Sequence, residues 1–180
     1  LNATDIGEAG NDTLFSRDSS MYDDGGHVKA YVMGNGSVGV RIQDTSNSYY
    51  LNSAPGLISD GQWHHVALSF GDEGLTLYVD GAVADSSSYT GGIAGNTEPW
   101  TLGADQQSSG DGIANSLTNY FNGGLDEFAV YDTQLTPDEL TALSGSGVTA
   151  VESLVMSGDS LQGDAGADTL LGGAGGDTLQ

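Results

Sequence analysis

Residues 60–83 read DGQWHHVALSFGDEGLTLYVDGAV, and this stretch decides the fold. Apolar side chains alternate with small or polar ones in two runs, and successive residues of a strand point to opposite faces of a sheet. Residues 71–74, which read GDEG, are typical of a hairpin turn, and Gly81 suits a second turn because glycine tolerates positive φ. The stretch therefore predicts a hairpin with two apolar rows in the middle of a buried layer. The rows are Val66, Leu68 and Phe70, and Leu75, Leu77 and Val79.

The runs at 27–33 and 37–43 alternate in the same way around Gly34-Asn35-Gly36, a strong hairpin signal. Arg41 is expected to point outward, because it alternates with Val40 and Ile42. Residues 120–131 predict a last long strand, with Asp126 on the same row as Phe128 and Val130. Many short alternating runs and 29 glycines favour an all-β fold, a two-sheet antiparallel sandwich.

One short helix is expected near the end of the sandwich. Thr136 suits the N-cap, Pro137 the first helical position, and Asp138 and Glu139 the first turn. The helix is expected to end near Ser144-Gly145.

Charge limits the classes of partner. The chain of 180 residues has 3 Lys and Arg against 25 Asp and Glu, a net charge of −22. A field of that sign repels nucleic acid and anionic membrane surfaces and attracts cations. Cysteine is absent, so disulfides and thiolate metal sites are excluded. No apolar run approaches the ~20 residues of a membrane helix, so membrane insertion is not expected.

The tail carries a nine-residue period. Residues 163–171 read GDAGADTLL and residues 172–180 read GGAGGDTLQ. Glycines allow tight turns, Asp carboxylates and turn carbonyls suit Ca²⁺, and the leucines are expected to pack inward. A flexible linker is the alternative, but linkers do not keep a fixed phase. Two copies are few for a stable roll, so further repeats of the same chain are expected beyond Gln180, in a longer protein.

The order of motifs along the chain resembles that of the laminin-G-like, concanavalin A-like jelly-roll domains. The motifs are DGQWHHVA at 60–67, LYVDG at 77–81, LGA at 102–104, YFNGGLDEFAVY at 120–131 and LTPDEL at 135–140. The tail resembles the RTX (repeats-in-toxin) calcium-binding repeats. These resemblances imply a jelly roll over 1–145, a connector strand or linker over 146–156 and a short parallel β-roll over 157–180. They also imply Ca²⁺ as cofactor and a secreted bacterial protein, exported by a type I system and possessing extracellular or cell-surface partners.

Metal candidates follow from the carboxylates in glycine-rich loops. Asp126 would be costly on a buried row unless backbone N–H groups, His64 or Ca²⁺ bound it. The candidate ligands are Asp18, Asp24, Asp105, Asp111 and Asp126 in the sandwich, and Gly163, Asp164, Gly166, Asp168, Gly172, Gly173, Gly175 and Asp177 in the tail.

Three functions remain open: a non-catalytic glycan- or surface-binding module of an adhesin-like protein, an accessory domain of a secreted polysaccharide hydrolase or lyase, and a calcium-stiffened spacer. Sugars are held by exposed aromatic faces and polar groups. The candidates for such contacts are Arg41, Tyr49, Tyr50, Trp100, Asn119 and Tyr120, each with packing at the sheet edge as its alternative.

Catalysis by this segment is not expected. Glucanases of the resembled fold carry Glu-x-Asp-x-Glu on one strand, and that string is absent here. Jelly-roll alginate lyases carry Gln-x-His together with an Arg-rich strand; Gln62-Trp63-His64 fits the first of these, but no Arg-rich strand is present. Asp126 and Glu127 are adjacent, so they are expected to face opposite ways. His64 shares its parity with Val66, which favours a hydrogen-bonded core histidine. Trp63 lies on the other parity and is expected to be covered by a loop.

Overall fold

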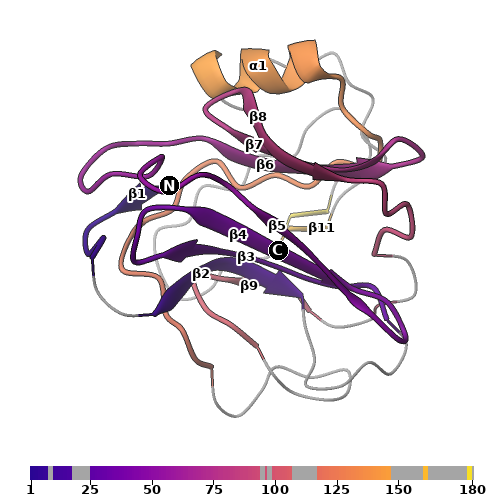
Figure 1. Cartoon of the computed structure of the whole chain (residues 1–180), viewed down its shortest axis with the longest axis horizontal. Coiled ribbons are helices and arrows are strands. Elements are labelled where there is room, and N and C mark those ends of the chain that lie inside the picture. The colour runs from indigo at the N-terminus through magenta and orange to yellow at the C-terminus, as the bar shows by residue number, and fades with distance from the viewer. Residues whose placement is uncertain are drawn as a thin grey trace. The chain divides into compact units, whose positions relative to one another are not determined.

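A computed structural model of the chain describes residues 1–7, 10–17, 25–93, 96, 99–106, 117–146, 160–161 and 178–179. The chain forms two compact units, Leu1–Asp126 and Glu127–Gln180. The two larger antiparallel sheets of the first unit lie in separate layers (Figure 1).

The larger sheet has five strands in the order β5-β4-β3-β2-β9. The predicted hairpin around Asn35 and Gly36 is confirmed, since Val38 lies opposite Val32 and Gly36 adopts a φ of 72°. A register shift between Thr13 and Phe15 marks a bulge in β2. The strands are β2 (Asn11–Arg17), β3 (His27–Met33), β4 (Val38–Gln43), β5 (Ser48–Asn52) and β9 (Thr101–Leu102).

The smaller sheet has three strands, β6 (Val66–Gly71), β7 (Gly74–Val79) and β8 (Ala82–Ser87). The hairpin predicted at 60–83 is confirmed, because Val66, Leu68 and Phe70 lie opposite Val79, Leu77 and Leu75. The β7–β8 turn is also confirmed, with φ of 51° at Asp80 and 77° at Gly81.

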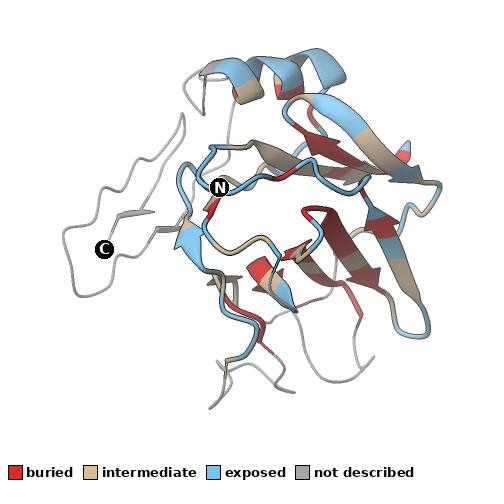
Figure 2. Ribbon diagram, turned by 60° about the vertical axis from the view of Figure 1, so that its left-hand side comes forward, coloured by how far each residue is buried: buried red, intermediate tan, exposed pale blue. Residues whose placement is uncertain are grey.

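The core lies between the two sheets, which confirms the sandwich. The buried residues in Figure 2 lie mainly on strands. At one edge the carboxylate Oδ2 of Asp85 in β8 accepts the N–H of Asn52 in β5 at 2.8 Å, which ties the layers together. The core residues are Val28, Ala30 and Val32 of β3, Val38, Val40 and Ile42 of β4, Leu51 of β5, Leu75, Leu77 and Val79 of β7, and Ala3, Leu14 and Ile58.

The long strand predicted at 120–131 is wrong. Tyr120 forms an isolated bridge to Thr13, and only Gly123–Gly124 (β10) pairs with β1 (Asn2–Ala3). The backbone has positive φ at Asn119, Gly123 and Glu127, of 50°, 151° and 52°. Asn119 precedes the predicted strand and Gly123 lies in β10, so it is the left-handed φ of Glu127 that interrupts the extended backbone. The alternation of side chains there does not produce a continuous strand.

In the second unit, helix α1 spans Pro137–Ser146, as the sequence predicts to within one or two residues. Thr136 and Glu139 form a capping box, in which Oε2 of Glu139 accepts the Thr136 N–H at 2.7 Å and Oγ1 of Thr136 accepts the Glu139 N–H at 3.3 Å. The connector predicted over 146–156 lies outside the described residues, apart from Ser146 at the end of α1. Within the described part of the chain, no helix has the length and apolar character needed to cross a membrane.

Strands β11 (Ser160–Leu161) and β12 (Thr178–Leu179) pair in parallel. The register joins Ser160 to Thr178 and Leu161 to Leu179, an offset of 18 residues in both pairs. That offset equals two nine-residue repeats, the spacing expected when each turn of a β-roll contains two repeats.

Candidate functional site

One straight row of residues crosses all five strands of the larger sheet on the face away from the core. Its register pairs join Thr101 to Ser16, Ser16 to Lys29, Lys29 to Arg41, and Arg41 to Tyr50. The core residues Val28, Ala30, Val40 and Ile42 have the opposite parity, so the row faces outward. The outward orientation predicted for Arg41 is therefore confirmed.

The Thr101–Ser16 end of the row is covered by residues 104–106. The hydroxyl of Ser16 donates to the carbonyl of Ala104 at 3.0 Å and accepts the N–H of Gln106 at 3.0 Å. Thr101 donates its hydroxyl to Oε1 of Gln106 at 2.9 Å. Asp105 and Gln106 are fully buried, so this end is packed and closed.

Lys29 lies at the boundary of the covered segment. Its ammonium group is 2.8 Å from Oδ2 of Asp105, and the Asn119 amide donates to the same oxygen at 3.2 Å. Asn119 and Asp105 were separate candidates, for sugar and for metal, and the structure brings them together. The buried carboxylate of Asp105 is neutralised here by an ammonium group, which removes the electrostatic reason for placing Ca²⁺ beside it.

The other end of the row is open. Tyr50 is 57% exposed and lies directly opposite Arg41. Tyr31 lies two register pairs from the row, and so on the same face, and it is buried with its ring against Gly39, where a Cβ atom would overlap the ring. Burial, and next the neighbouring Tyr50, raise the pKa of the Tyr31 hydroxyl, while Arg41 opposes the rise. Arg41, Tyr31 and Tyr50 therefore form one polar and aromatic group.

The remaining sugar candidates lie elsewhere. Tyr49 stacks on Tyr89 with ring centroids 3.8 Å apart and donates to Asp44 at 2.9 Å. Trp100 packs against the core edge, with Phe15 edge-on at 5.9 Å and the Arg17 guanidinium 5.6 Å from its ring. Tyr120 is exposed beside β2, on the segment that bridges to Thr13.

Asp126 is exposed, as are Phe128 and Val130, so the prediction of a buried row for Asp126 is wrong. A solvated carboxylate has no need of a metal or of His64 to offset desolvation. In the part of the chain that the structure describes, no group of three or more His, Asp or Glu residues could hold a metal ion. The other metal candidates, Asp18, Asp24, Asp111 and the tail residues from Gly163 to Asp177, lie outside the described residues.

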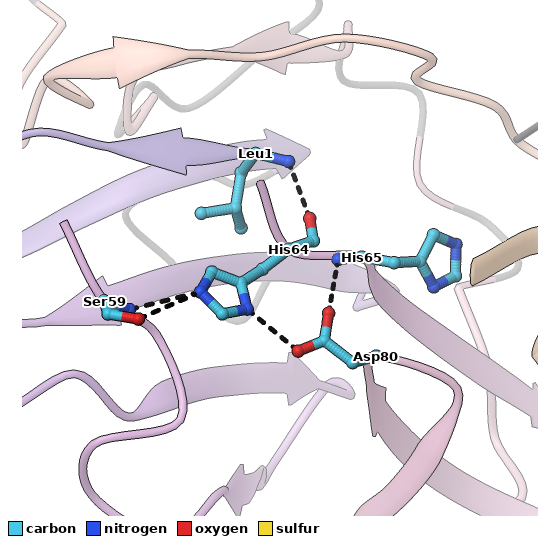
Figure 3. Close-up of polar contacts among 5 residues, drawn as sticks. All are labelled: Leu1, Ser59, His64, His65 and Asp80. Atoms are coloured by element: carbon cyan, nitrogen blue, oxygen red, sulfur yellow. Dashed lines mark hydrogen bonds and ion pairs between the residues drawn. The ribbon is translucent and has the colours of Figure 1, made fainter. Parts of the chain in front are cut away.

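A second polar cluster surrounds His64, and Figure 3 shows its ring between Ser59 and Asp80. Nδ1 of His64 lies 2.8 Å from Oδ2 of Asp80, and a carboxylate can only accept, so Nδ1 carries the proton. Nε2 then accepts the Ser59 N–H at 3.3 Å. The other oxygen of Asp80 accepts the His65 N–H at 2.9 Å. This confirms that His64 is a hydrogen-bonded histidine.

The contacts of Ser59, His64 and Asp80 follow the order of a hydrolase triad, but their geometry does not favour catalysis. The hydroxyl of Ser59 is 3.4 Å from Nε2, and the single Nε2 lone pair also receives the Ser59 N–H. The side chain of Asp80 is 51% exposed, unlike the buried carboxylate of such triads. The cluster instead ties the loop at Ser59, the start of β6 and the β7–β8 turn together. Leu1 joins them, because its N–H group and carbonyl pair with the His64 backbone, both at 2.8 Å.

The prediction that a loop covers Trp63 is wrong. Its side chain is 60% exposed, and its ring lies against Gly124 of β10.

Two residues of the site, Lys29 and Tyr31, were not among the candidates predicted from the sequence. Both alternate with Val28, Ala30 and Val32, so the sequence pattern already places their side chains on the outward face. The sequence does not reveal that Lys29 lies directly opposite Arg41.

Comparison with curated proteins finds a sushi, von Willebrand factor type A, EGF and pentraxin domain-containing protein 1. The rat (Rattus norvegicus) protein is 30% identical over 95 residues, and the mouse (Mus musculus) protein is 28% identical over 95 residues. Each match covers 49% of this chain and 3% of the relative. The chain therefore corresponds to a small part of these long proteins.

Solved structures with this fold include the CBM40 module of a Ruminococcus gnavus IT-sialidase bound to α2,3-sialyllactose. Its TM-score is 0.62 at 21% identity, and the alignment covers 79% of this chain and 78% of that one. A SAP-like pentraxin from Limulus polyphemus aligns with a TM-score of 0.56 at 20% identity, over 79% and 67% of the two chains. At these identities the likeness shows the fold alone.

Two family models match the chain, one over the sandwich and one over the tail, in the same order as the sequence motifs. Residues 157–179 match the RTX calcium-binding nonapeptide repeat, and the parallel β11–β12 pair with its 18-residue offset fits that repeat. Residues 6–141 match a family of jelly-roll domains over most of the chain, in agreement with the two-sheet sandwich. The chain belongs to the concanavalin A-like lectin/glucanases superfamily.

Proposed function

We propose that the sandwich is a non-catalytic glycan-binding module of a larger, calcium-dependent secreted bacterial protein with an adhesin-like role. The observation that carries this proposal is the open end of the outward row, where the exposed ring of Tyr50 lies opposite Arg41. An exposed aromatic face beside a multidentate donor is the usual means of holding a sugar ring.

The comparisons add support of a general kind. The superfamily contains lectins by its description, and the R. gnavus module with the same fold holds sialyllactose in its structure. The RTX repeats support an extracellular setting, because Ca²⁺ at extracellular levels binds the folded repeats and favours folding there. Domain boundaries at 145 and 157, export by a type I system and attachment to a cell surface are part of the same proposal.

A glycan array probed with the whole chain tests the function. We expect binding to a defined set of glycans that falls about tenfold in Tyr50→Ala, since an aromatic contact contributes about 0.5–1.5 kcal/mol beyond the apolar area that it buries. Val83→Ala is the matched control, because Val83 is similarly exposed at 61% but lies in β8 of the other sheet. Absence of binding to any glycan would favour the spacer role, and binding unchanged in Tyr50→Ala would move the site away from this row.

A further inference from the structure

The distribution of positive charge is uneven. The chain has only 3 basic residues against 25 acidic ones, and they are Arg17, Lys29 and Arg41. Arg17 packs with Trp100 and donates to the carbonyl of Asn96 at 2.6 Å. Lys29 and Arg41 lie directly opposite each other on the outward row.

Like charges placed directly opposite on neighbouring strands are unfavourable, because their Cβ atoms are only about 4.5–5.5 Å apart. Asp105 neutralises Lys29 through its ion pair. Arg41, directly opposite Lys29, places a second basic side chain on the row of a chain whose net charge is −22.

The surroundings of Arg41 suit a ligand of one chemical type. Tyr50 presents an exposed ring directly opposite Arg41, and burial raises the pKa of the Tyr31 hydroxyl above its ordinary value of 10.0. Neighbouring strands are about 4.8 Å apart, so the distance from Lys29 to Tyr50 is about that of one or two sugar rings. A guanidinium fork matches the two oxygens of a carboxylate.

We propose that Arg41 and Tyr50 form a subsite for a sugar that bears a carboxylate, in which Arg41 binds the carboxylate and Tyr50 stacks on the ring. This inference rests on the glycan-binding function proposed above and adds the chemical class of the glycan. Lys29 is neutralised by Asp105, so the charge assigned to the carboxylate of the sugar is that of Arg41.

The negative electrostatic field of the whole chain limits the size of the acidic glycan that we expect to bind. A net charge of −22 repels dense polyanions, whereas Arg41 attracts one carboxylate at short range. Short oligosaccharides with few carboxylates are therefore expected to bind better than long polyuronates when salt is low. The long-range repulsion is largely screened at an ionic strength of about 0.15 M.

The test is calorimetric titration of the whole chain with α2,3-sialyllactose and with trigalacturonate, each against its own methyl ester. The ester keeps the sugar ring but removes the negative charge. At an ionic strength of about 0.15 M, we expect at least one free acid to bind about tenfold more tightly than its ester. Arg41→Ala should remove that difference, Arg41→Lys should keep part of it, and Tyr50→Ala should weaken acid and ester alike.

Two controls separate this subsite from other effects. Asp72→Asn, in the exposed β6–β7 turn, changes the net charge by one unit without touching the row and should leave the acid preference unchanged. Titrations with Ca²⁺ and with EDTA should agree, since a glycan bridged by Ca²⁺ to acidic loops would lose binding in EDTA and would ignore Arg41→Ala. Equal unfolding midpoints of the variants exclude loss of fold.

Equal affinity for acid and ester, or an acid preference that survives in folded Arg41→Ala, would overturn the subsite while leaving the glycan-binding function intact. If neither sialyllactose nor trigalacturonate binds and no glycan on the array binds, both the subsite and the glycan-binding function are overturned.

Discussion

The ammonium group of Lys29 lies 2.8 Å from Oδ2 of Asp105, and the two residues are 76 positions apart in the chain. The side chain of Lys29 is 15% exposed and that of Asp105 is fully buried. This pair fastens the segment after β9 over one end of the outward row and leaves the other end open. The ligand proposed above is therefore expected at the open end.

Removing one partner of this pair should destabilise the sandwich. Asp105→Ala leaves the Lys29 ammonium group and the Asn119 amide without their shared acceptor, and we expect a loss of about 2–4 kcal/mol in the free energy of unfolding. Urea denaturation measures it. Asp72→Asn, in a solvated turn, should change stability by less than about 0.5 kcal/mol. A cost of that small size for Asp105→Ala would show that solvent replaces the pair.

Gly39 is required by the ring of Tyr31, which occupies the space that a Cβ would take. Gly39→Ala should therefore cost about 1–3 kcal/mol, as overpacking does. In a Tyr31→Ala background the same change should cost much less, because the obstructing ring is gone. Thermal unfolding of the four proteins of this cycle gives the coupling, and additive costs would contradict the contact.

His64 and Asp80 should be energetically coupled. His64→Ala removes the bond to Asp80 and frees the Ser59 N–H, with an expected cost of about 1–2 kcal/mol. Asp80→Asn keeps a residue that tolerates the φ of 51° at this position, but its single carbonyl oxygen cannot serve both His64 and His65. A double-mutant cycle in urea should give a coupling of at least about 0.5 kcal/mol, and glycan binding should be unchanged in both variants.

Acid should weaken the turn between β4 and β5. The backbone N–H groups of Ser46 and Asn47 are the main cause that lowers the pKa of Asp44 from 3.8, and the Tyr49 hydroxyl adds to it. A carboxylate with a lowered pKa contributes stability that is complete above 3.8 and is lost as pH falls through its folded value. The difference in Tm between the natural chain and Asp44→Asn should therefore shrink from pH 5 toward pH 2.

Scanning calorimetry at several pH values measures this change. Tyr49→Phe removes one of the bonds to Asp44 and should produce a smaller change of the same sign. A difference in Tm that does not vary with pH would contradict the assignment of these bonds to the ionised form.

Calcium should bind the tail. In the nine-residue repeats, Asp168 and Asp177 occupy the aspartate position, and carboxylates are required for the affinity of such turns. We expect the double variant Asp168→Asn, Asp177→Asn to bind Ca²⁺ at least about tenfold more weakly by isothermal titration calorimetry. The unfolding midpoint assigned to the sandwich should be the same in EDTA and in Ca²⁺ for this variant. Unchanged affinity would place the calcium sites elsewhere.

Local patterns predicted the parts of the fold that depend on near neighbours. The hairpins at Asn35-Gly36 and at 71–74 and the capping box of Thr136 each require only residues a few positions apart, whose preferences act in the unfolded chain as well. The same logic predicted the outward orientation of Arg41, since strict alternation leaves one choice of face.

The strand predicted at 120–131 and the burial of Trp63 were wrong for a common reason. Alternation states which residues share a face, but not whether a partner strand covers that face. The left-handed φ of Glu127 interrupts the predicted strand, and Trp63 is left exposed beside Gly124.

The sequence by itself determined the two-sheet class, the nine-residue phase of the tail and the side of the sheet on which Arg41 lies, because these depend on periodicity. Only the tertiary structure decided that Lys29, Arg41 and Tyr50 form one row and that Asp105 and Asn119 close one end of it. Lys29 and Asp105 are 76 positions apart in the chain. The row itself depends on the register among β3, β4 and β5, which the alternation within each strand does not encode.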